Sequence, residues 1–468
     1  MKYSHILFTG LLSGGLLLSG CDEELELQPQ QTLSADAAFA DELTAQGSLI
    51  GVYSLAQDLE VYGSMPQVIA DYQSDNVDFI GSFPTLQDIN DYATLSDNGS
   101  LSTLWRDNYE TILAANAVIA SVPDVDDPGF TAEEKAQFVA EAKFLRALIY
   151  FQMVNLFANP INVEGAGALG IPIVNDPFTG EVELPARATV GEVHTQIQQD
   201  LQEGVTALPE SNLGRATSGA AQALLSRLQL YRGESQQAAA LARAVIDGGV
   251  YELASNYAFF SQNTSEEVFS LQNSATDNGR TGSGGWASYY SPAESGGRGD
   301  APFAQGLIDA YAEEPGDLRF STLIEYSPDS SLIFTDKFSD AVTNSDNVPV
   351  IRVTEMYLSL AEALAELNGI NQESVDLVNV LRTRAGLTEW TVGQFGNQEE
   401  FIDAILVERR KELAFEGHRR MDLLRKGKAL RSSGPTADIS NPGDPKTIMP
   451  IPQREIDLNS NLVQNDGY

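Results

Sequence analysis

Residues 220–249 read AAQALLSRLQLYRGESQQAAALARAVIDGG and contain the pattern that decides the fold. A helix rich in small residues is predicted over Ala220–Tyr231, Gly233 provides a turn, and Ser235 is the expected N-cap of a second helix. Apolar residues at helical spacing from Ala239 to Ile246 form the inner face of that second helix, and two glycines end it. Small side chains let the two helices approach closely. The stretch therefore predicts a helix hairpin of about 30 residues, close to the tetratricopeptide repeat (TPR) unit of about 34.

Further helices are predicted on both sides of this hairpin. Thr131 with Glu134, and Thr189 with Glu192, form capping boxes at the starts of two amphipathic segments. Other helices are expected over residues 354–368, 374–385, 399–415 and 419–426, and weak strand patterns over 267–272 and 332–338. We therefore predict a mainly α chain with about four TPR-like helix pairs, an irregular, loop-rich region and few short strands.

The composition excludes several classes of function. The chain has 468 residues with 28 Lys and Arg against 66 Asp and Glu, a formal net charge of −38. The electrostatic field of so negative a chain repels the phosphate backbone of nucleic acids, so we expect no nucleic-acid partner. Cys21 is the only cysteine, which excludes an intrachain disulfide and a cysteine-rich zinc site. Three histidines lie far apart in the sequence and give little support for a metal or catalytic site.

The first residues, MKYSHILFTGLLSGGLLLSGC, predict export and a lipid anchor. Ile6–Leu18 is an apolar run too short to span a membrane and suited to the core of a signal peptide over residues 1–20. Leu18-Ser19-Gly20-Cys21 resembles a bacterial lipobox, which implies that Cys21 carries lipid and that residues 21–34 form a tether. An ordinary secretory signal with an accidental cysteine is the alternative. Asp22-Glu23-Glu24 resembles the export signal of surface-exposed lipoproteins, so we expect the outer membrane, with exposure at the cell surface rather than in the periplasm.

An ordered set of motifs resembles the SusD/RagB family of outer-membrane nutrient-binding lipoproteins. The most specific is ERRKELAFEGHRRMDL at residues 408–423. The other matching segments are Trp105–Ile112, Glu141–Ala147, Arg352–Leu358, Leu381–Leu387 and Gln464–Tyr468. Together with the lipobox they extend over almost all of the mature chain.

This resemblance implies one domain over residues 35–468, built on a TPR scaffold with an irregular second half. It also implies a protein that binds a nutrient, usually an oligosaccharide or polysaccharide, and delivers it to a SusC-like TonB-dependent β-barrel transporter as its lid. No enzyme activity, catalytic residue, metal or cofactor is expected. Two alternatives stay open: a surface glycoside hydrolase that uses two carboxyl groups, and a TPR scaffold with only protein partners.

A loop over residues 273–302 is the first candidate ligand site. It has seven glycines and no periodicity, and long irregular loops are often functional. It contains Trp286, Tyr289, Tyr290 and Arg298, and aromatic faces are suited to packing against sugar rings. The alternative is that these aromatic side chains only hold the loop against the body.

Asp75 and Asn76 form the second candidate site, because their side chains can hydrogen-bond sugar hydroxyls, as can Arg106. The alternative is turn formation, for which Ser-Asp-Asn is well suited. The acids of Glu408–Arg425 share a helix face as metal ligands do, but basic residues alternate with them. We therefore predict a structural ion-pair network for that segment.

Overall fold

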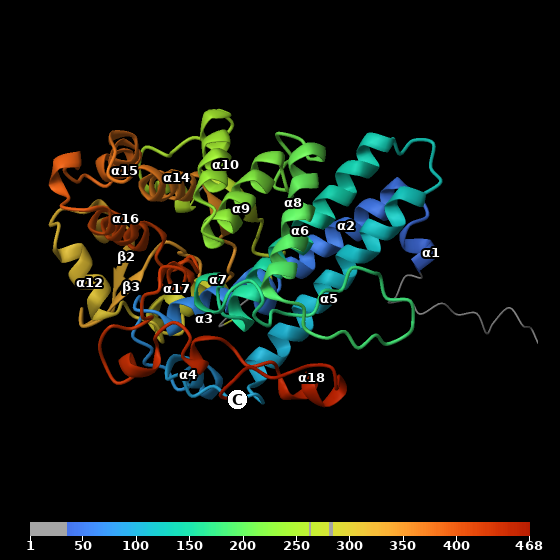
Figure 1. Cartoon of the computed structure of the whole chain (residues 1–468), viewed down its shortest axis with the longest axis horizontal. Coiled ribbons are helices and arrows are strands. Elements are labelled where there is room, and N and C mark those ends of the chain that lie inside the picture. The colour runs from blue at the N-terminus through green and yellow to red at the C-terminus, as the bar shows by residue number, and fades with distance from the viewer. Residues whose placement is uncertain (1–34, 262–263, 280–283) are drawn as a thin grey trace, which may run out of the picture.

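The fold was analysed in a computed structural model, which describes residues 35–261, 264–279 and 284–468. The predicted signal peptide 1–20, the lipid-bearing Cys21, the tether 21–34 and part of the predicted ligand loop therefore lie outside the described residues. The described chain is mainly helical, as predicted (Figure 1). None of the described helices is both long enough and apolar enough to cross a membrane.

The first half is a series of helices that pack against one another in chain order. They are α2 (Glu42–Ala56), α5 (Gly99–Ser121), α6 (Ala132–Phe157), α8 (Val190–Ala207), α9 (Ser218–Tyr231) and α10 (Ser235–Asp247). Both predicted capping boxes are present, since Thr131 and Thr189 each accept from the backbone of a glutamate three residues later. These caps satisfy backbone N–H groups that the first turn of a helix leaves without partners.

The hairpin that decides the fold is confirmed as α9 and α10, which pack together. Gly233 has φ +75°, a conformation that favours glycine, at the turn between them. The Ser226 hydroxyl donates to the Ala238 carbonyl at 2.9 Å, which shows how closely the helices approach. The predicted N-cap Ser235 is wrong: Ser235 is the first helical residue, it follows Glu234, and no side-chain cap is made there.

The second half continues from β4 (Val348–Arg352) into α14 (Val353–Asn368), α15 (Gln372–Arg384), α16 (Gln398–Leu413) and α17 (Arg419–Leu424). Helix α14 packs against α10, α15 and α16, so it joins the two halves. In Figure 1 the α2, α5 and α6 helices lie at one end of the molecule and α14, α15 and α16 at the other, with α9 and α10 between them.

Short elements complete the described structure. The helical ones are α1 (Ala35–Ala38), a π-helix (Leu59–Gly63), α3 (Met65–Gln73), α4 (Pro84–Asn90), α7 (Ile161–Glu164), α11 (Trp286–Tyr290), α12 (Gln305–Ala312), α13 (Leu318–Thr322) and α18 (Gln453–Leu458). The strands β1 (Glu267–Leu271) and β4 pair antiparallel, as do β2 (Ile324–Tyr326) and β3 (Ile333–Thr335). Both predicted strand segments are confirmed, although β3 is shorter than the pattern suggested.

The acids around α16 do form a buried ion-pair network, but the expectation that the basic residues alternating with them are their partners is wrong, because their cations come from other elements. Glu408 pairs with Arg319 and Arg382, and Glu412 pairs with Arg384 at 2.8 Å. Glu416 binds two further cations, as described below. All of these side chains are almost completely buried. The acids that share one helix face are therefore used to neutralise buried arginines.

Candidate ligand-binding face

The two candidate ligand regions, more than 200 residues apart in the sequence, lie side by side. Val77 and Phe303 form an antiparallel bridge. The Asp78 N–H donates to the Pro302 carbonyl at 3.0 Å, and the Ile80 N–H donates to the Asp300 carbonyl at 2.8 Å. The segment that follows α3 therefore runs beside the end of the glycine-rich loop.

Asp71 connects these two regions from beneath. Its carboxylate accepts from the Tyr290 hydroxyl at 2.7 Å and from the Asn76 side-chain amide at 2.9 Å. Burial raises the pKa of Asp71 to about 6, although both hydrogen bonds oppose the rise. The predicted site residue Tyr290 thus holds the loop onto α3, while Asn76 fixes the segment that follows α3.

Asp75 is bound by arginines from the C-terminal part of the chain. Arg419 contacts both of its carboxylate oxygens, at 2.7 and 2.8 Å, and Arg410 lies 3.4 Å away. Burial raises the pKa of Asp75, but the hydrogen bonds and charge of Arg419 outweigh it and leave the pKa below its usual value. Arg410 also donates to the Asn76 side-chain oxygen at 3.1 Å. Asp75 and Asn76 therefore have structural partners, and a role in binding ligand stays a prediction.

The predicted aromatic residues form helix α11 and are buried: Trp286, Tyr289 and Tyr290 are 5%, 4% and 1% exposed. Trp286 packs on Phe338 at 4.9 Å between ring centroids, and Tyr290 meets Phe415 edge-on at 5.4 Å. These contacts match the alternative in which the rings hold the loop against the body. In this structure they offer no open face to a sugar, so their role in binding also stays a prediction.

Arg298 links the buried rings to the surface. Its guanidinium lies 4.9 Å from the Tyr289 ring and 5.5 Å from the Phe83 ring, and it pairs with Asp300 at 2.8 Å. Cation–π contacts of this kind hold aromatic and guanidinium planes together. The predicted residue Arg298 therefore lies at the junction of the two candidate regions.

Two residues that sequence reasoning missed make this junction a candidate binding surface. Ile80 and Phe83 are large apolar side chains that are 55% and 50% exposed. We call the surface formed by Phe79, Ile80, Phe83, Arg298 and Asp300 the loop face. The available signal for Phe83 is the aromatic and apolar content of residues 77–83, VDFIGSF, directly after Asp75-Asn76.

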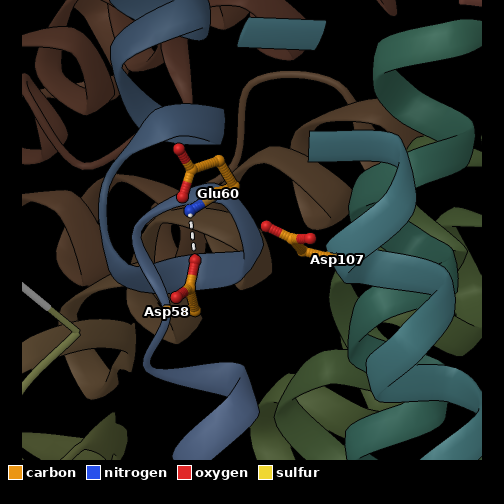
Figure 2. Close-up of side chains that lie close together, drawn as sticks. All are labelled: Asp58, Glu60 and Asp107. Atoms are coloured by element: carbon orange, nitrogen blue, oxygen red, sulfur yellow. Dashed lines mark hydrogen bonds between the residues drawn. The ribbon is translucent and has the colours of Figure 1, made fainter. Parts of the chain in front are cut away.

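A separate acidic cluster lies where the π-helix meets α5 (Figure 2). Carboxylate oxygens of Asp58, Glu60 and Asp107 lie within 4.8 Å of one another. Asp58 accepts from the Glu60 backbone N–H as the N-cap of the π-helix, and Arg106 donates to Asp107 at 2.6 Å. The predicted candidate Arg106 is thus placed in this cluster, where it offsets one of the three charges.

The comparisons with known proteins agree with this architecture. A sequence model described as the SusD family matches residues 331–468, and one described as starch-binding and associating with the outer membrane matches residues 25–230. The chain belongs to the SusD/RagB family. The two matches flank the irregular middle of this SusD/RagB protein, which contains the predicted ligand loop.

Individual relatives of the family extend over nearly the whole chain. SusD-like protein P25 of Formosa agariphila is 26% identical over 96% of this chain and 95% of its own. A SusD superfamily structure from Bacteroides thetaiotaomicron superposes with a TM-score of 0.81 at 27% identity, covering 90% of this chain and 98% of that one. A laminarin-binding SusD-like protein superposes with a TM-score of 0.75 at 26% identity, covering 92% and 100%. The predicted mainly helical, SusD-type fold is therefore confirmed.

Proposed function

We propose that this protein is a cell-surface lipoprotein that binds a glycan and passes it to a SusC-like, TonB-dependent outer-membrane transporter, for which it acts as a lid. Family membership supports this proposal, as do the starch-binding description of one matching model and the laminarin-binding structural neighbour. Binding without turnover is part of the proposal. Glu408, Glu412 and Glu416, which resembled a catalytic or metal-binding set in the sequence, are each paired with buried cations.

The observation that carries the proposal is the loop face. Its exposed Phe83 ring packs over Arg298, and Arg298 is held in turn by Asp300. Sugar C–H groups pack on apolar and aromatic surfaces, and a nearby charged pair can orient hydroxyl groups by hydrogen bonding. Since Tyr289 and Asp71 fix the loop from beneath, this surface is organised before a ligand arrives.

Calorimetry with a panel of oligosaccharides, including starch and laminarin fragments, tests the glycan-binding proposal. Phe83→Ala should weaken binding of the preferred glycan by about tenfold, the effect of losing one ring contact. Phe178→Ala is a matched control, because Phe178 is 65% exposed on a different loop. Wild-type affinity in the Phe83 variant, or no binding of any glycan by the wild type, would contradict the proposal.

Anchoring and transport need separate experiments. If Cys21 is lipidated, Cys21→Ala should abolish the incorporation of labelled fatty acid into the protein in the native cells. The lid role predicts that the wild-type protein co-purifies with a barrel transporter from those membranes. Absence of the label from the wild-type protein, or its retention in the Cys21 variant, would overturn the lipid anchor at Cys21, and purification without a barrel would overturn the lid role.

A further inference from the structure

A groove runs along strand β1, apart from the residues of the loop face. It consists of two adjoining hollows of about 260 and 280 Å³, which share Glu267 and Gln272 as lining residues. Phe259, Phe260, Phe338, Asn273, Asp346 and Asn347 line the first hollow. Leu213, Arg215, Thr217 and Tyr251 are among the residues that line the second. We call the combined surface the β1 groove.

One wall of the first hollow is aromatic. Phe260 is its half-buried ring, stacked on Phe259 at 4.2 Å and approached by the edge of Phe338 at 6.3 Å. Arg352 and Lys337 lie 5.1 and 5.2 Å from the Phe260 centroid. These cations fix the ring by cation–π contact. Because Phe259 and both cations already lie over this ring, only the part of Phe260 that stays exposed is available to the C–H groups of a sugar.

The polar part of the lining is ordered by its own hydrogen bonds. The Asn273 backbone N–H donates to the Asn347 side-chain oxygen at 2.9 Å, and the Asn273 side chain donates to the Asp346 carbonyl at 3.0 Å. The Asp346 carboxylate accepts from the Asp340 N–H at 2.7 Å. Because these bonds lock residues 272–273 to residues 340–347, the polar groups are held in place before a ligand binds. Such preorganisation reduces the entropy lost on binding.

The charge of the first hollow favours neutral ligands. Its acidic side chains are Glu267 and Asp346. Arg352, which also lines this hollow, is already paired with Glu266 at 3.0 Å and with Glu416 at 2.8 Å. Burial raises the pKa of both Glu267 and Asp346, so each carboxyl is nearer to protonation than usual and able to share hydrogen bonds with hydroxyl groups. The cation of this lining is engaged in ion pairs, so a sulfate or uronate group gains no strong partner here and a neutral sugar is favoured.

The second hollow extends the same surface. Leu213 is fully exposed and has φ +36°, a backbone conformation that is strained for a leucine. Strained, exposed residues recur where a protein contacts a ligand. The Tyr251 hydroxyl and the Thr217 hydroxyl are hydrogen-bonded at 2.7 Å on the same side of β1. The exposed Leu213 side chain and this pair of hydroxyl groups can therefore contact further sugar units, beyond those at the aromatic residues of the first hollow.

We infer that the β1 groove is a second carbohydrate site, separate from the loop face, and that it takes a neutral oligosaccharide of several units. The inference rests on the proposed function for the class of ligand, but its residues are different. Each site can therefore fail while the other stands.

The test uses the full-length protein and calorimetry with neutral hexasaccharides of glucose, mannose and xylose, beside a hexagalacturonate. The wild type should bind a neutral hexasaccharide at two sites and the galacturonate more weakly. Phe260→Ala should weaken one of the two binding events by about tenfold and leave the other, while Phe83→Ala should do the reverse. Leu213→Ser should also weaken the groove event. Because Leu213 is fully exposed, that variant does not endanger folding. Phe178→Ala should change neither event.

The outcomes separate the two sites. Loss of all binding in Phe83→Ala, with wild-type binding in Phe260→Ala and Leu213→Ser, would overturn the groove and leave the loop face. Loss of binding only in the groove variants would support the groove and overturn the loop face, and absence of binding by the wild type would overturn both. Crystals soaked with the same hexasaccharide should show density along β1. Density there with no matching event in calorimetry would mean binding at crystal concentration only, which overturns the inference.

Discussion

The network around α16 and the loop face use charged side chains in opposite ways. In the network, Glu408, Glu412 and Glu416 are almost fully buried and each is in contact with two or more basic residues. On the loop face, the Arg298–Asp300 pair reaches the surface beside the exposed Phe83 ring. A dense run of charges in a sequence therefore indicates a structural core here, whereas a ligand surface is formed by a few polar groups next to exposed apolar ones.

The largest effect is expected from breaking the network. Glu412 contacts Arg384 at 2.8 Å, Arg319 at 3.4 Å and Arg352 at 3.6 Å. Glu412→Gln leaves buried cations with one carboxylate fewer, and removing one partner of a buried pair costs about 3–5 kcal/mol. We expect a loss of that size in the free energy of unfolding, measured by urea denaturation.

The control for this prediction is an exposed pair of the same chemistry. Glu203 pairs with Lys143 on the surface, and exposed pairs contribute about 0–1 kcal/mol. Glu203→Gln should therefore be nearly neutral. If Glu412→Gln and Glu203→Gln destabilise the protein equally, the network does not have the structural role described above.

Acidification should reduce the contribution of the α16 network to stability and increase that of Asp71 beneath the loop face. Burial raises the pKa of Glu416, but Arg352 and Lys337 outweigh it and lower the pKa to about 2. The carboxyl of Glu416 therefore binds a proton more tightly in the unfolded state than in the folded state. Its contribution to stability is present above about pH 4.5 and is lost as the pH falls toward 2. The wild type should therefore lose about 3 kcal/mol relative to Glu416→Gln over that range, measured by denaturation at each pH.

Asp71 beneath the loop face should respond in the other direction. Its folded-state pKa is raised to about 6 by burial, so the folded state binds the proton more tightly than the unfolded state. Its contribution to stability is fully present below about pH 4 and is lost as the pH rises through 6. Relative to Asp71→Asn, the wild type should gain about 2–3 kcal/mol between pH 7 and pH 4. A parallel pH dependence of the two proteins would show that Asp71 is not buried as described.

Tyr290→Phe should give a smaller effect that is confined to the loop. The change removes the hydroxyl that donates to Asp71 at 2.7 Å and keeps the ring against Phe415. A hydrogen bond to a charged group contributes about 1.5–3 kcal/mol, so we expect a loss at the lower end of that range at pH 7. The loss should shrink at pH 4, where Asp71 is protonated, and a loss that does not depend on pH would argue against this contact.

The sequence predicted the helical scaffold well, because its signals are local. Capping boxes at Thr131 and Thr189 and small residues in α9 and α10 act within one or two turns. The charges of α16 do not, since Glu408 and Glu412 pair with arginines of other elements. Helices α2 and α5 were not predicted. In α2, apolar side chains lie on its exposed as well as its buried side, as Leu43 and Leu49 show, so no single apolar face appears in the sequence.

The candidate site was harder to predict because it depends on contacts between distant segments. Nothing local in the sequence indicates that Tyr290 reaches Asp71, or that residues 77–80 pair with residues 300–303. Aromatic content predicted Trp286 and Tyr289 as site residues, and both are buried, whereas Phe83 is half exposed beside Arg298. Which of several rings faces solvent is decided by tertiary packing and not by residue type.

The smallest effect on the free energy of unfolding is expected for Phe83→Ala, on the loop face. Because half of the ring is already exposed, Phe83→Ala removes little buried area, and surface changes are usually within about 0.5 kcal/mol. Arg298 keeps Asp300 and Tyr289 as partners in the variant, so the loop should stay in place. Urea denaturation of Phe83→Ala should therefore match that of the wild type while glycan affinity falls. A destabilisation above about 1.5 kcal/mol would mean that Phe83 holds the loop in place, and the loop face would then be one more packed region like the α16 network.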